Sequence, residues 1–109
     1  MKNIKLEDLK ENIERGVILR CKGQYPYEEY VDFMVIEQQD QYALLVISGY
    51  KAGLIFVYLP KESIPQDNNG YAIDLEWLKS NWNEWGYSDC PINDVHIIYK
   101  DSPTSFSDR

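Results

Sequence analysis

Apolar residues recur along the chain at two spacings, one typical of a helix and one typical of strands. The helical spacing is clearest at positions 75, 78, 82 and 85, where Leu, Leu, Trp and Trp follow i, i+3, i+7 and i+10. Asp74 precedes this stripe as an N-cap residue, and Gly86 follows it as a left-handed C′ residue. The pattern predicts a helix over 74–85 that holds all three tryptophans and buries Trp82 and Trp85.

Strand-like runs fill most of the remaining chain. They predict strands over 17–22, 30–37, 42–48, 54–59 and 95–100, with short polar or glycine-containing connections between the second, third and fourth. Short connections imply antiparallel hairpins. The run 43–47 is apolar throughout, which favours a strand buried on both faces near the centre of the sheet.

A second helix is predicted at the N-terminus. Leu6, Leu9 and Ile13 are spaced i, i+3 and i+7, Arg15 is the last helical residue, and Gly16 is the stop. The fold class is therefore α+β: an antiparallel sheet of about five strands, with an N-terminal helix and a Trp-rich helix packed on it. Residues 1–100 form one such domain, and 101–109 form a polar C-terminal tail.

Charge is distributed unevenly. The net charge is -7, and residues 23–99 hold 12 acidic residues against three basic ones. An acidic surface repels nucleic acid and anionic lipid and attracts basic proteins, so we expect neither of the first two as a partner. Solubility alone is the competing explanation of this charge.

Few residues here could carry chemistry. His96 is the only histidine, so the sequence predicts neither a metal site nor a cofactor. The N-terminus lacks the apolar core of a signal peptide and no apolar run is long enough to span a membrane, which indicates a cytoplasmic protein. Cys21 and Cys90 are then expected to be free thiols.

One motif leaves an enzymatic alternative open. Ser48 and Lys51 match the Ser-x-x-Lys pattern of penicillin-binding enzymes. The partner motifs Ser-Asp-Asn and Lys-Thr-Gly do not occur in the chain, and the pair falls in a glycine turn after a strand. A small hydrolase using Ser48 and Lys51 therefore remains only an alternative, and we expect no enzyme.

Two stretches carry a family resemblance. The run from Tyr42 to Ser63, YALLVISGYKAGLIFVYLPKES, and the run from Asp74 to Pro91, DLEWLKSNWNEWGYSDCP, resemble bacterial immunity proteins of the Imm45 family. The likeness covers most of the chain, from about Tyr25 to Tyr99. It implies a protein from a polymorphic or contact-dependent toxin system that binds and neutralises a cognate toxin in the producing cell. It assigns no binding residues.

The sequence offers two candidate patches for such a partner, a basic nuclease-type toxin domain being the expected one. Acidic and aromatic side chains together make good contacts for a basic surface. The first patch is Tyr27, Glu28, Glu29, Tyr30 and Asp32, and the second, on the helix flank away from the apolar stripe, is Trp77, Asn81 and Glu84. A monomer is expected, and a generic acidic adaptor module is a further alternative function.

Overall fold

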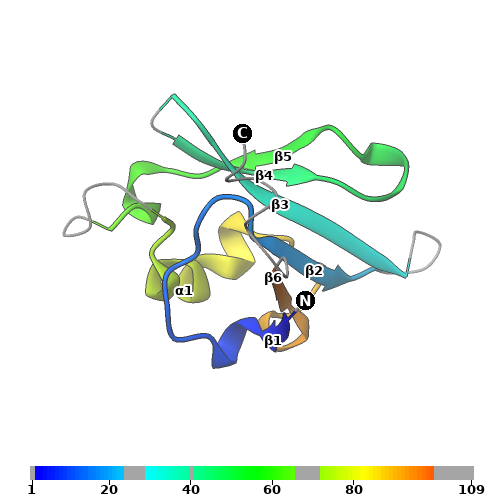
Figure 1. The fold of residues 1–109 in the computed structure, drawn as a ribbon, viewed down its shortest axis with the longest axis horizontal. Helices are drawn as coiled ribbons and strands as arrows, with labels where there is room; N and C mark the ends of the chain where they lie inside the picture. The colour runs from blue at the N-terminus through cyan, green and yellow to red at the C-terminus, as the bar shows by residue number, and fades with distance from the viewer. Residues whose placement is uncertain (1, 24–28, 40, 66–71, 100–109) are drawn as a thin grey trace, which may run out of the picture.

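One antiparallel sheet of six strands forms the body of the molecule (Figure 1). In this computed structural model the described residues are 2–23, 29–39, 41–65 and 72–99. The strand order is β1-β6-β2-β3-β4-β5, so β1 and β5 are the two edges. The strands are β1 (Lys2–Lys5), β2 (Ile18–Lys22), β3 (Tyr30–Gln38), β4 (Gln41–Val46), β5 (Ile55–Tyr58) and β6 (His96–Tyr99).

The described residues form a single α-helix, α1 (Leu75–Trp85), which packs beside the sheet (Figure 1). Short 3-10 turns complete the fold: η1 (Leu6–Asp8), η2 (Gly49–Lys51), η3 (Lys61–Ser63) and η4 (Ile92–Asp94). The α+β class and the five strands predicted within 17–100 are confirmed, although the count of five is short by β1. The predicted tail at 101–109 lies outside the described residues.

The tryptophan-containing helix begins where the sequence predicts. The Asp74 carboxylate accepts hydrogen bonds from the amides of Glu76 and Trp77, at 3.0 and 3.3 Å. A second cap comes from far along the chain, because Asn12 Oδ1 accepts from the amide of Leu75 at 2.9 Å. These contacts satisfy three of the amides that a helix N-terminus leaves without intrahelical partners.

The helix ends differently from the prediction. Gly86 has φ −96°, which is not the left-handed conformation expected of a C′ glycine. The residue is small for a steric reason instead, since a Cβ built on Gly86 would overlap the ring of Trp82. The end of α1 is therefore determined by how closely the chain passes the buried indole.

The predicted N-terminal helix is wrong. Residues 2–5 form β1, a single 3-10 turn follows, and Ile13 then makes an isolated antiparallel bridge with Ile73. Leu6, Leu9 and Ile13 are all buried, so their spacing did mark core positions. Of these three, only Leu9 donates within a helical turn, to the Leu6 carbonyl at 3.1 Å, whereas Leu6 donates to Val95 at 2.9 Å and Ile13 to Ile73 at 3.0 Å. Tertiary pairing has overridden local periodicity.

The core lies between α1 and one face of the sheet. Trp82 is 1% exposed, and its Nε1 donates to the backbone oxygen of Cys90 at 2.8 Å. Leu75 and Leu78 are buried with it as predicted, whereas Trp85 is only half-buried. The sheet contributes side chains from its middle strands, which are Leu19, Cys21, Phe33, Val35, Leu44 and Val46.

β4 lies between β3 and β5 and is buried along most of its length, as its apolar run predicts. β5 is equally apolar in sequence but forms an edge, and Phe56 and Tyr58 are exposed there. The other edge, β1, has a lysine at each end. One edge of the sheet thus exposes aromatic side chains and the other begins and ends with lysine. The aromatic edge, β5, is a candidate binding surface.

Candidate partner-binding surfaces

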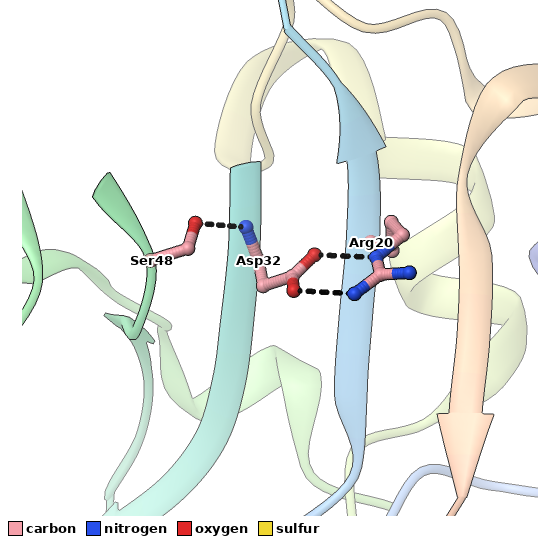
Figure 2. Close-up of polar contacts among 3 residues, drawn as sticks. All are labelled: Arg20, Asp32 and Ser48. Carbon is pink, nitrogen blue, oxygen red and sulfur yellow. Dashed lines mark hydrogen bonds and ion pairs between the residues drawn. The ribbon is translucent and has the colours of Figure 1, made fainter. Parts of the chain in front are cut away.

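The first predicted patch is only partly within the described residues, because Tyr27 and Glu28 lie outside them. Glu29 and Tyr30 are exposed at the start of β3. Asp32 is half-buried, and its carboxylate accepts two hydrogen bonds from Arg20 of the neighbouring strand, at 2.9 and 3.0 Å (Figure 2). The fold therefore places the positive charge of Arg20 beside this patch, although residues 23–50 contain no basic residue.

Arg20 is held from two sides. The hydrogen bonds with Asp32 raise the pKa of the Arg20 guanidinium above its ordinary value, and the cation also lies 5.4 Å from the centre of the Tyr30 ring. Asp32 in turn has a second contact, because its amide donates to Ser48 Oγ at 2.9 Å (Figure 2). Asp32 of β3 thus links β2 to the residue Ser48, which follows β4. Among the described residues of the first patch, Glu29 is the acid with an exposed side chain.

The second predicted patch lies on α1. Trp77 is half-buried against the core and its ring centre lies 6.3 Å from that of Trp85. Asn81 Nδ2 donates to the Trp77 carbonyl at 2.8 Å, which leaves its side chain lying along the helix. Glu84 is exposed. The two tryptophans pack against one another here, so much of the aromatic surface of this patch is used within the molecule.

A third surface, which the sequence reading did not identify, lies at the β4–β5 turn. Among the described residues, the large hydrophobic side chains that are exposed are Tyr30 at 48%, Tyr50 at 70%, Leu54 at 59%, Phe56 at 42% and Tyr58 at 47%. Four of these five fall between positions 50 and 58. Such clustering differs from scattered surface apolar residues and is typical of interaction surfaces.

The turn itself is built on two glycines in the left-handed region. Gly49 has φ +74° and Gly53 has φ +98°, values that other residues adopt at a cost. Gly53 donates to the Val46 carbonyl at 2.7 Å, and the Val46 amide donates to Leu54 at 2.9 Å. These bonds close the hairpin and hold Tyr50 and Leu54 on its exposed end. Figure 1 shows this turn at the end of the molecule remote from α1.

An irregularity in the β4–β5 pairing sets the direction of Phe56. Leu44 pairs with Val57 and Leu45 with Ile55, so Phe56 is the extra residue of a β-bulge. The bulge places Phe56 on the same side of the sheet as Phe33, with ring centres 5.0 Å apart. Tyr87, which follows α1, lies 5.5 Å from Phe33 and 5.8 Å from Phe56. Three rings from separate segments therefore meet here.

A cavity of about 240 Å³ lies beside these rings. Its buried lining residues are Phe33 and Val46, and its half-buried ones include Tyr87. Its exposed lining residues are Tyr50, Lys51, Phe56 and Asp89. We call Tyr50, Leu54, Phe56 and this cavity the hairpin surface. A sequence signal for it existed in the density of large apolar side chains between two turn-forming glycines and Pro60, but the same run also fits a buried strand.

Ser48 and Lys51, the pair of the enzymatic alternative, both line the cavity. The Ser48 oxygen accepts the Asp32 amide, and the Lys51 ammonium lies 5.7 Å from the centre of the Tyr50 ring. A serine nucleophile needs a base that takes its proton, which an amide donor does not provide. The contact with the Asp32 amide thus gives Ser48 a structural role after the end of β4.

The two cysteines meet in the core. Both are free thiols, and both are fully buried. A hydrogen bond with Cys90, together with burial, raises the pKa of the Cys21 thiol.

Within the described residues there is no group of three or more His, Cys, Asp or Glu side chains placed to hold a metal ion. In the same part of the chain, no helix has the length and apolar character needed to cross a membrane.

Comparison with known proteins shows the family. Residues 7–97 match the family model of Immunity protein 45, which is most of the 109-residue chain. The chain belongs to the Immunity protein 45 family. The match includes α1, strands β2 to β5 and the first two residues of β6, so the resemblance found in the sequence is confirmed. Neither the curated proteins nor the solved structures that were searched gave a match.

Proposed function

We propose that this member of the Immunity protein 45 family neutralises a cognate toxin by binding it stoichiometrically, inside the cell that produces the toxin. The observation that carries this proposal is the family match over residues 7–97. The Ser48 hydroxyl accepts the Asp32 amide and lies within the fold as a structural contact, which agrees with inhibition by occupancy rather than by catalysis.

We further propose that the toxin domain is basic, as nucleases are because they bind phosphates. The net charge of -7 supports this, since it attracts a basic domain and speeds the encounter. A bound acidic protein would occupy the surface that the nucleic acid needs. Among the described residues of the two predicted patches, Glu29 and Glu84 are the exposed acids, and either could face the approaching toxin.

Stoichiometry is the direct test of the proposed function. The toxin domain encoded beside the gene of this chain is titrated with the purified chain, and residual toxin activity is measured. Loss of activity that is complete near one equivalent supports inhibition by binding. Loss at a small fraction of an equivalent would instead reveal an enzyme, and Ser48→Ala would then be the variant to examine.

A pair of charge-reversal variants separates the two predicted patches. Glu29→Lys and Glu84→Lys each add the same charge to the chain, at the start of β3 and on α1 respectively. The patch that guides the toxin is the one whose variant slows association more at low salt. The difference should shrink as the screening length falls toward about 8 Å at physiological salt. Equal association rates for both variants and the unmodified chain would exclude steering by either patch.

A further inference from the structure

We infer that the hairpin surface is the anchor for the toxin, with the cavity beside Phe56 receiving one large apolar or aromatic side chain of the toxin domain. This inference rests on the proposed function and adds the surface and the chemistry of the contact. It assigns anchoring to residues that neither predicted patch contains.

Exposure is the first argument. Tyr50 and Leu54 are more exposed than any other large hydrophobic side chain in the described part of the chain. Keeping such groups in water is unfavourable, and covering them with a partner recovers that free energy. Aromatic residues at the centre of an interface supply much of the binding free energy.

The size and lining of the cavity argue for a protein side chain. A volume of about 240 Å³ is below the roughly 300–1,000 Å³ usual for sites that take a whole small molecule. Rings of Phe33, Phe56 and Tyr87 form one of its sides, and they are already packed together before a partner arrives. A prearranged apolar site costs little conformational entropy on binding.

Charge separates a toxin from a second copy of this chain as the occupant. The cavity carries one acid and one base, Asp89 and Lys51, so its own charge is balanced and suits an apolar anchor. The chain as a whole carries -7, which opposes self-association and favours a basic partner. We therefore assign two tasks to two regions: the acidic surface sets the association rate, and the hairpin surface sets the dissociation rate.

The test compares two tyrosines. Tyr50→Ala removes an exposed ring that lines the cavity. Tyr58→Ala removes an exposed ring from β5 that pairs with Ala43 and lies on the other face of the sheet. Binding kinetics are measured with the toxin domain encoded beside the gene. Tyr50→Ala should raise the dissociation rate by at least about tenfold and leave the association rate within about threefold. Tyr58→Ala should change neither rate by that much.

The inference about the anchor and the proposed function fail in different ways. If the unmodified chain binds and both Tyr50→Ala and Leu54→Ala dissociate at its rate, the hairpin surface is not the anchor and the proposed function stands. No binding by the unmodified chain would refute the proposed function itself. A concentration-dependent dimer of the free chain that Tyr50→Ala abolishes would assign the hairpin surface to a second copy, and would also overturn the inference.

Discussion

α1 and the hairpin surface are both rich in large apolar side chains, yet they use them in opposite ways. In α1 the most deeply placed ring, Trp82, is almost fully buried and bonded to the Cys90 carbonyl. At the β4–β5 turn, Tyr50 is exposed over 70% of its surface. The comparison teaches that aromatic content alone does not indicate a binding site. The position of a ring in the fold determines whether it is buried and stabilises the protein or is exposed and available for a contact.

The largest expected effect belongs to Trp82. Trp82→Ala should lower the free energy of unfolding by about 3–5 kcal/mol, because it removes a buried ring, leaves a cavity and deprives the Cys90 carbonyl of its donor. Urea unfolding monitored by circular dichroism gives the value. A loss below about 1 kcal/mol would show that this ring does not hold α1 on the sheet.

Gly86 tests the close passage at the end of α1. Gly86→Ala introduces a Cβ that would overlap the Trp82 ring, so we expect a loss of about 1–3 kcal/mol from overpacking. Gly53→Ala is a useful comparison, because nothing lies within 4 Å of its added Cβ and any loss there comes from its φ of +98°. A smaller loss from Gly86→Ala in a Trp82→Phe background than in the unmodified chain would support the steric explanation. An equal loss in both backgrounds would contradict it.

Asp74 caps α1 and should have an intermediate effect. Asp74→Ala leaves the amides of Glu76 and Trp77 without their acceptor and should cost about 1 kcal/mol. Asp74→Asn keeps the acceptor oxygen and is the matched control. If both variants lose equal stability, the charge rather than the cap would be responsible.

Tyr50 completes the comparison with the smallest effect on folding. Tyr50→Ala should change the free energy of unfolding by no more than about 0.5 kcal/mol, because its ring is mostly in water. The same unfolding experiment measures it beside Trp82→Ala. A loss comparable to that of Trp82→Ala would mean that the ring supports the turn, and the contrast between the two regions would fail.

Local rules predicted α1 well, since the cap at Asp74 and the buried positions Leu78 and Trp82 depend on residues close in sequence. They failed for residues 6–15, where the same apolar spacing is satisfied by pairing with residues 73 and 95. β1 was missed because its four residues include two lysines and one apolar side chain, too little for a strand pattern.

The candidate site was harder to predict than the fold. The apolar run of β5 fits a buried strand and an edge equally well, and only the strand order decides between them. The contact of Phe56 with Tyr87 joins residues about 30 positions apart, and the bulge at Phe56 depends on the β4–β5 register, so no local pattern encodes either. Likewise, the pairing of Asp32 with Arg20 depends on the β2–β3 register and alters the acidic patch read from the sequence.

Hydrogen exchange of the chain, free and bound to the toxin domain, tests the central claim most directly. The account predicts slower exchange on binding for amides in residues 49–58 and little change in α1, whose amides already belong to the folded core. Slower exchange confined to α1 around Trp77 and Glu84, with residues 49–58 unaffected, would contradict it.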